Sequence, residues 1–206
     1  MLSQFLAKPL ETHWKVAKYV LRYLKGTTDF CLKYTDLFDV ELTSYSDSDW
    51  VGNPDDRRST TDYSLSIGSW IVSWSNKKHP TVSLSSIEEE YKAMRVETCE
   101  VVWFKRVIQD VGEEQKKATI MKCDNHSSIK LENNPMYHAR TKHVDAQFHL
   151  VREKIQSKEI FLEYCNTREN ATNIFTKPLA NIKFALFGYI LVVQINPSSL
   201  KGEFLK

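Results

Sequence analysis

Two aspartates, Asp47 and Asp49, alternate with serines in the stretch Ser46–Trp50. The residue types before them favour a β-strand, and a Gly-Asn-Pro run just after Val51 ends it. Side chains at i and i+2 of a strand point to the same face, so these two carboxylates would repel each other. Water, a basic partner or a metal ion has to offset that repulsion. Taken alone, the stretch also fits a solvated aspartate pair in a turn.

Two further acids stand at the ends of predicted elements. Glu90 lies in the first turn of a predicted helix over residues 86–111, and Asp124 directly follows a predicted strand over residues 119–123. Each has an ordinary explanation, because acids favour the first turn of a helix and Asp often caps the helix that follows it. Each of the two acids, taken alone, therefore also fits an ordinary structural role.

The predicted elements place these acids on a mixed sheet. Hydrophobic periodicity and capping residues predict helices at 9–25, 86–111, 127–133, 142–156 and 171–177. Alternating patterns predict strands at 30–35, 42–50, 82–84, 119–123 and 160–165, with a hairpin over 63–74 that turns at Gly68-Ser69. Residues 51–62 and 77–80 are predicted loops. Strands followed by alternating strands and helices indicate an α/β protein with helices on the faces of its sheet.

Composition permits a folded domain and argues against several classes of protein. The chain has 206 residues, 42% of them hydrophobic, and its net charge of +2 permits a nucleic-acid partner without arguing for one. The four cysteines are scattered and form no CxxC pair, which predicts buried, reduced thiols. We find no secretory signal and no apolar stretch long enough to cross a bilayer, so we expect a protein that is neither secreted nor in a membrane.

Several longer blocks occur in one order along the chain. They are His13-Trp14 with LRYLKGT at 21–27, YSDSDW at 45–50, RRST at 57–60, LSS at 84–86 with Glu88 and Glu90-Tyr91, CDN at 123–125, Asn134-Pro135 with HARTKH at 138–143, and FTKPL at 175–179. In this order, residues 1–180 resemble the C-terminal part of the polyprotein of copia-type retrotransposons. That part is the ribonuclease H domain, which follows the reverse transcriptase.

The resemblance implies a ribonuclease H-like fold, in which a five-stranded mixed sheet, with three antiparallel strands and then parallel additions, is flanked by helices. It implies hydrolysis of the RNA strand of RNA–DNA hybrids with two Mg²⁺ ions, or Mn²⁺ in their place. Carried over by motif, Asp47, Glu90 and Asp124 would bind the metal. The family's fourth acid precedes the Ile-Phe-Thr-Lys block, where this chain has Asn173. Asparagine keeps a carbonyl oxygen but loses a charge, so we expect Asn173 to take part in catalysis at reduced activity.

The resemblance also implies boundaries and partners. Residues 1–28 would be a helix left over from the reverse transcriptase or connection region, residues 29–180 the ribonuclease H-like domain, and residues 181–206 a divergent, poorly ordered tail. Partners would be the RNA–DNA hybrid and the reverse transcriptase of the parent polyprotein, in a cytoplasmic virus-like particle or the nucleus, with no membrane and no small-molecule cofactor. Candidate contacts to nucleic acid, besides a basic Lys77-Lys78 loop, are Arg57, Arg58, Asn125, Arg140, Lys142 and His143.

Other functions fit parts of the sequence. The chain can be read as a non-catalytic fragment of a decayed element that acts at most as a nucleic-acid-binding module. It can also be another nuclease or strand-transfer enzyme on the same fold, since fold does not fix substrate. Zinc binding by His138, His143 and His149 is a weaker alternative, because their spacing fits no common zinc pattern and no cysteine pair supports it.

Overall fold

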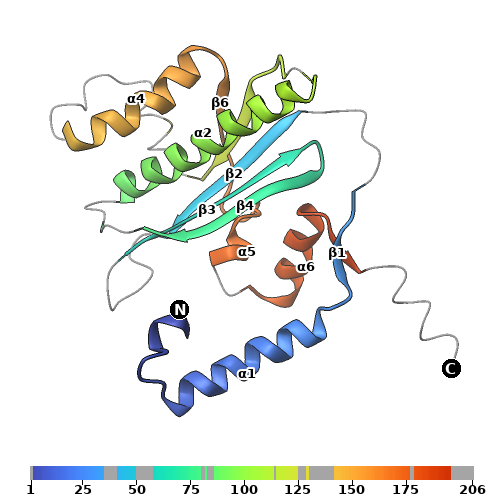
Figure 1. Ribbon diagram of the computed structural model, residues 1–206. Coiled ribbons are helices and arrows are strands. Elements are labelled where there is room, and N and C mark those ends of the chain that lie inside the picture. Colours follow the sequence, from blue (N-terminus) through green and yellow to red (C-terminus); the bar gives the residue numbers. More distant parts are fainter. Residues whose placement is uncertain are drawn as a thin grey trace, which may run out of the picture. The chain divides into compact units, whose positions relative to one another are not determined.

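The computed structural model describes residues 2–34, 41–49, 58–79, 82, 86–113, 115–124, 129, 142–176 and 179–195 (Figure 1). The chain divides into two units. One is made of Met1–Lys33 with Val193–Lys206, and the other of Tyr34–Val192. The acids singled out above all belong to the second unit, which therefore carries the candidate site.

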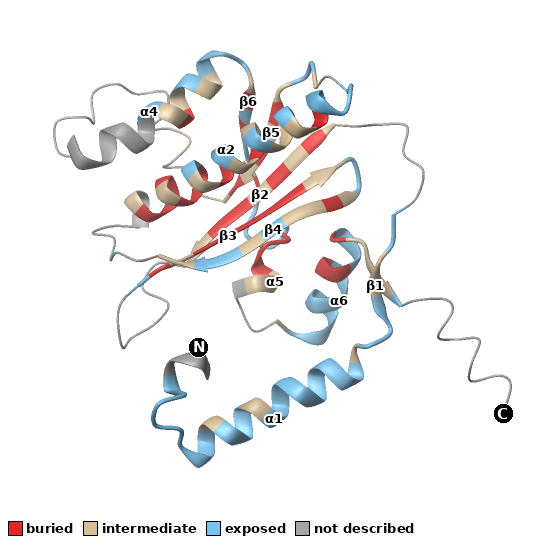
Figure 2. Cartoon of the chain, viewed as in Figure 1, coloured by how far each residue is buried: buried red, intermediate tan, exposed pale blue. Residues whose placement is uncertain are grey.

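The first unit contains a helix whose apolar stripe is exposed. After a short 3₁₀ helix, η1 (Leu2–Phe5), helix α1 (Glu11–Gly26) runs close to its predicted bounds and has no buried residue (Figure 2). Trp14 is 57% exposed and Leu21 is 60% exposed. Strand β1 (Phe30–Leu32) pairs antiparallel with β7 (Val193–Ile195), so two segments far apart in the sequence form a two-stranded sheet.

A five-stranded mixed sheet forms the second unit. Its strands along the chain are β2 (Leu42–Asp49), β3 (Thr60–Ile67), β4 (Trp70–Lys78), β5 (Thr119–Cys123) and β6 (Ile160–Tyr164). In the sheet they lie side by side in the order β4–β3–β2–β5–β6. The first three are antiparallel, and β5 and β6 are parallel to β2. The hairpin turns at Gly68, whose positive φ of 54° suits glycine at the first position of such a turn. The predicted fold class is confirmed.

The helices α2 (Ser86–Asp110) and α4 (Lys142–Gln156) lie on one face of this sheet, over a continuous core (Figures 1 and 2). The predicted stripe of α2 is buried, with Met94 and Val101 at 1% and 0% exposure. Leu42 from β2, Leu65 from β3 and Met121 from β5 meet this stripe. The apolar residues of each strand lie on one face of the sheet, and those of α2 lie on one side of the helix. Their burial against each other therefore determines which face of β2 and β5 turns toward α2.

A short helix, α5 (Asn173–Thr176), lies against β3. The side-chain amide of Asn76 on β4 donates to the carbonyl oxygen of Phe175 at 2.8 Å and ties α5 to the sheet. Helix α6 (Asn181–Ile190) follows, with Phe187 only 1% exposed. Our expectation of a poorly ordered tail therefore does not hold for residues 181–195, which form α6 and β7. The apolar run there shows no helical period, so its sequence gave no signal.

Some predictions differ from the structure in other places. Lys77 and Lys78, predicted as a loop, are the end of β4, where they pair with Thr61 and Thr60. Of the four cysteines, which are all free, Cys123 and Cys165 are buried but Cys99 is exposed. The predicted helix at 127–133 and strand at 82–84 lie almost entirely outside the described residues. Within the described residues, no helix combines the length and apolar character needed to cross a bilayer.

Candidate active site

Asp47 and Asp124 lie at the same end of two neighbouring parallel strands. In the ladder between β2 and β5, Tyr45 pairs with Lys122, and the two aspartates each lie two residues further along their chains. Asp47 belongs to β2 and is 2% exposed, whereas Asp124 directly follows β5 and is half-buried. The sheet therefore brings together two carboxylates that are 77 positions apart in the sequence.

Glu90 reaches the same region from the first turn of α2. It is 8% exposed, and burial raises the pKa of its carboxyl to about 7. The negative charges of Asp124 and Asp47 contribute to this rise, while the nearby hydroxyl of Ser48 opposes it. These charge effects act only over short range in a protein, so the three acids predicted from the sequence share one region.

A fourth carboxylate in this region was missed. We predicted residues 51–62 as a loop, but β3 begins at Thr60, and Asp62 stands directly opposite Asp47 in the antiparallel ladder. Residues opposite each other share a face of the sheet, and Asp62 is fully buried. Only the strand register could have revealed this pair, because the local sequence of Asp62 reads as polar loop.

A polar turn that follows β6 positions Asp124. The hydroxyl of Thr167 donates to Oδ2 of Asp124 at 2.7 Å. The side-chain amide of Asn170, which is fully buried, donates to the carbonyl oxygen of Ser46 at 2.7 Å and so ties the turn to β2 next to Asp47. The roles of Thr167 and Asn170 at this site were not predicted, because a short polar segment after a strand indicates a turn but not what its side chains contact.

Asn173 closes the same turn from the start of α5. Its Nδ2 donates to the carbonyl oxygens of Thr167 at 2.7 Å and Asn170 at 2.9 Å. The residue is 3% exposed. The amide therefore makes two bonds that a carboxylate cannot make, since both partners are acceptors. In this structure Asn173 holds the turn whose Thr167 contacts Asp124.

The oxygen donors in this region fit Mg²⁺ in chemical type, because carboxylate and amide oxygens are hard ligands. Within the described residues, no three His, Cys, Asp or Glu side chains lie close enough together to hold a metal ion as they stand. Carboxylates repel one another when no cation is between them, so they would have to approach one another to share an ion.

No protein-family model matches the sequence. The chain is 38% identical over 186 residues to the retrovirus-related Pol polyprotein from transposon TNT 1-94 of Nicotiana tabacum. The aligned region covers 90% of this chain and 14% of that protein. It is 34% identical over 198 residues to the corresponding polyprotein from transposon RE2 of Arabidopsis thaliana, covering 96% of this chain and 14% of that protein. The chain belongs to the family of copia-type retrotransposon Pol polyproteins.

This copia-type Pol chain thus spans about one seventh of the length of these curated relatives, or 14%. Among solved structures it is similar to the N-terminal RNase H domain of a Mycobacterium tuberculosis protein, at 10% identity and a TM-score of 0.48, covering 73% of this chain and 97% of that one. Its five-stranded mixed sheet, with three antiparallel strands and two parallel additions, has the arrangement that the resemblance to the ribonuclease H domain implied.

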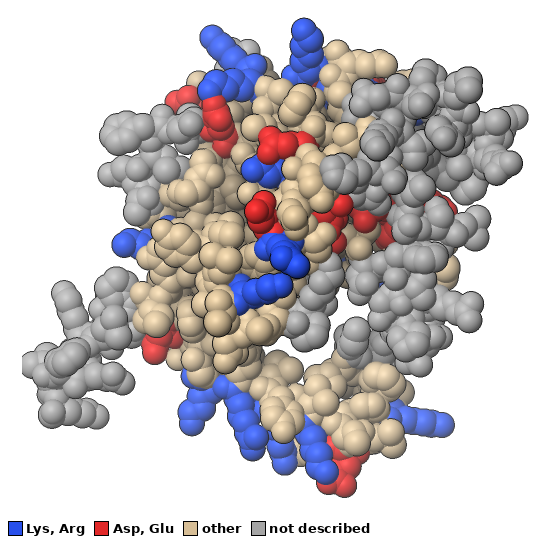
Figure 3. Space-filling model, turned by 180° about the vertical axis from the view of Figure 1, so that it is seen from behind, with Lys and Arg blue, Asp and Glu red and all other residues tan. Residues whose placement is uncertain are grey.

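The residues predicted to contact nucleic acid are only partly visible in this copia-type Pol chain. Arg58 is exposed, while Arg57, Asn125 and Arg140 lie outside the described residues, as do the side chains of Lys142 and His143. On the face seen in Figure 3, acidic and basic side chains of the sheet unit are interspersed, without a broad field of one sign. Of the histidines weighed as zinc ligands, His149 is exposed on α4, and the side chains of His138 and His143 are not described.

Proposed function

We propose that this part of the copia-type Pol chain is a ribonuclease H that hydrolyses the RNA strand of RNA–DNA hybrids with divalent metal ions. The observation that supports it is the electrostatic effect of Asp47, on β2, and Asp124, after β5, on the buried carboxyl of Glu90 on α2, which indicates that the three acids lie in one region. Buried like charges lower stability unless they serve a ligand, so such a meeting is typical of a functional site.

In this proposal Asp47, Glu90 and Asp124 hold Mg²⁺, with Mn²⁺ as a substitute. The bound ions would supply an activated water and stabilise the leaving oxygen of the phosphodiester. The chain's own residues would hold the carboxylates in place. Thr167 fixes the orientation of Asp124 by its 2.7 Å hydrogen bond, and Asn170 fixes the turn against β2. We assign Asn173 a positioning role toward this site, since its amide holds the turn that carries Thr167.

A second candidate is a nucleic-acid-binding module without cleavage. It is favoured by Asn173, which stands where the resemblance implies an acid and which directs its Nδ2 to two carbonyl oxygens. In either case the proposed partners are an RNA–DNA hybrid and the reverse transcriptase of the parent polyprotein. The exposed apolar residues of α1 are suited to packing against another protein segment, since monomeric proteins seldom leave such a stripe uncovered.

A magnesium titration of cleavage tests the proposal. A short RNA–DNA hybrid with a labelled RNA strand is incubated with the chain and with Asp47→Asn, with duplex DNA and single-stranded RNA as comparison substrates. We expect magnesium-dependent cleavage of the RNA in the hybrid alone, reduced at least a hundredfold by the substitution. Binding measured without magnesium accompanies it. Binding without cleavage supports the module, cleavage of duplex DNA supports another nuclease, and absence of both contradicts each proposal.

A further inference from the structure

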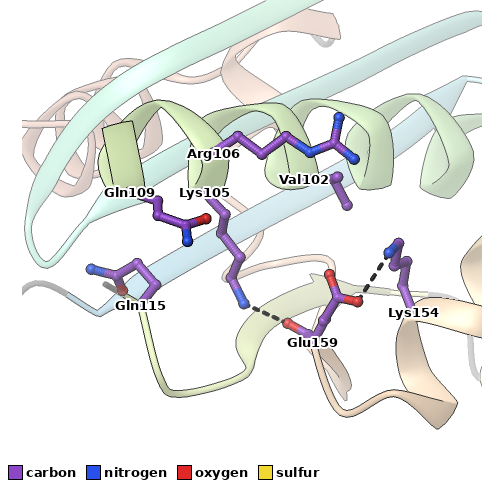
Figure 4. Close-up of a pocket in the computed structure, with 7 residues that line it drawn as sticks. All are labelled: Val102, Lys105, Arg106, Gln109, Gln115, Lys154 and Glu159. Carbon is purple, nitrogen blue, oxygen red and sulfur yellow. Dashed lines mark hydrogen bonds and ion pairs between the residues drawn. The ribbon is translucent and has the colours of Figure 1, made fainter. Parts of the chain in front are cut away.

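A polar cavity lies far from the acids, at the other end of α2. It has a volume of about 260 Å³ and lies between the last turns of α2 and α4 and the segments that lead into β5 and β6 (Figure 4). Its lining is formed by Val102, Lys105, Arg106, Gln109, Gln115, Lys154 and Glu159. Glu90 and Arg106 are sixteen residues apart on one helix, which corresponds to about 24 Å at 1.5 Å per residue. The cavity is therefore separate from the candidate active site.

Three cationic side chains and one carboxylate belong to the lining of this cavity. The ammonium group of Lys154 donates to Oε1 of Glu159 at 2.9 Å. Lys105 reaches across from α2 and donates to the backbone carbonyl oxygen of Glu159 at 2.8 Å (Figure 4). It also donates to the backbone carbonyl oxygen of Lys117 at 3.2 Å. Arg106 makes no hydrogen bond or ion pair with any described residue. The lining carries an excess of two positive charges, which is the charge that a phosphate dianion would neutralise.

The donors in this lining are not all used. An ammonium group has three N–H donors and a guanidinium has five, whereas Lys105 uses two and Arg106 none among the described partners. The side-chain amides of Gln109 and Gln115 add further neutral donors. Burial lowers the pKa of Lys105, the negative charge of Glu159 raises it, and the positive charge of Lys154 lowers it, so an anion entering the cavity would favour the charged form of this lysine.

A purely structural role explains part of the arrangement. Cations near the C-terminal ends of helices offset the helix dipole, and Lys105 and Lys154 also join α2 and α4 to the segment before β6. This brace does not include Arg106, an exposed residue of the lining, and it does not explain the open volume between these side chains. We propose that the cavity binds a phosphate group, either as free phosphate or a small phosphate ester, or as part of a nucleic-acid backbone. Its volume lies just below the usual range for drug-sized ligands, which suits a small anion.

The test is a titration with inorganic phosphate at constant ionic strength, with chloride as the reference salt and without magnesium. Phosphate binding is followed by the thermal unfolding midpoint and by phosphorus NMR. Arg106→Gln is compared with Arg95→Gln, which removes the same charge from another exposed position of the same helix, outside the cavity lining. Lys154→Met is a second variant, since it removes a cavity cation without a new polar group.

We expect phosphate to raise the unfolding midpoint of the wild type more than chloride does. Arg106→Gln and Lys154→Met should each weaken phosphate binding about tenfold, whereas Arg95→Gln should leave phosphate binding unchanged. A labelled hybrid in EDTA distinguishes the sources. If Arg106→Gln also weakens hybrid binding, the cavity takes a backbone phosphate; if only free phosphate is affected, it takes a small anion. No excess effect of phosphate, or equal binding by the two arginine variants, overturns the proposal. The result does not depend on cleavage.

Discussion

Glu97 is a buried acid that no proposed function uses, and its replacement gives a sharp test of the structure. It lies in the middle of α2 and is 1% exposed. Burial raises the pKa of its carboxyl from 4.5 to about 7, against a smaller lowering by the neighbouring hydroxyls of Ser44 and Ser46 on β2. The folded chain thus keeps a proton on Glu97 at a pH where the unfolded chain has lost it.

The size and sign of the effect follow from this difference. One pKa unit corresponds to about 1.4 kcal/mol, so a carboxyl shifted from 4.5 to about 7 lowers the free energy of unfolding by about 3 kcal/mol at pH 8. The folded state binds more protons than the unfolded state, so stability is lost as the pH rises from 4.5 through 7. Below 4.5 both states hold the proton, and the difference vanishes. Glu90 acts in the same direction and in the same pH range.

Glu97→Gln should therefore stabilise the chain, because the amide is neutral at every pH and can hydrogen-bond to the two serine hydroxyls. We expect urea unfolding at pH 8 to show a gain of about 3 kcal/mol over the wild type, and at pH 4.5 a gain below about 0.5 kcal/mol. Glu113→Gln, at an exposed position after α2, is the matched control and should leave the pH dependence unchanged. Parallel stability curves for wild type and Glu97→Gln between pH 4.5 and 8 would refute the reasoning.

Two further substitutions test the turn after β6. Asn170→Ala removes the hydrogen bond to the Ser46 carbonyl oxygen, so the free energy of unfolding measured by thermal unfolding should fall by about 2–4 kcal/mol. Arg168→Ala, at an exposed position of the same turn, should lower it by less than about 0.5 kcal/mol. Asn173→Asp replaces the donating amide by a carboxylate oxygen that faces two carbonyl oxygens. We expect the free energy of unfolding to fall by about 1–3 kcal/mol and hybrid cleavage not to increase. Faster cleavage by Asn173→Asp at low magnesium would instead support a metal-ligand role for this position.

The elements predicted best were those whose signals are local. Strand β5 and helix α4 have their predicted bounds, and α2 ends one residue before its predicted end. Their apolar residues recur at the period of the element, and capping or glycine residues mark where each one begins or ends. Asp47, Glu90 and Asp124 could be singled out for the same reason, since each lies at a recognisable position in or beside such an element.

The differences arise where a distant segment decides the local structure. The end of β4 is charged and polar and reads as a loop, but pairing with Thr60 and Thr61 of β3 extends the strand to Lys78. Strand β7 forms because β1 offers a partner more than 150 residues earlier in the sequence. No local pattern contains either partner, so neither strand extent could be predicted from the segment itself.

The amino-acid sequence by itself determined the family, the order of the described strands and helices up to α5, and the choice of three of the acids, because periodicity and motif blocks are properties of short segments. Only the tertiary structure decided what surrounds each polar group. It buried Glu97 beside Ser44 and Ser46, placed Asp62 opposite Asp47, and turned the amide of Asn173 toward two carbonyl oxygens. The physical reason is that the charge and the hydrogen bonds of a buried side chain depend on neighbours that folding brings from remote parts of the chain.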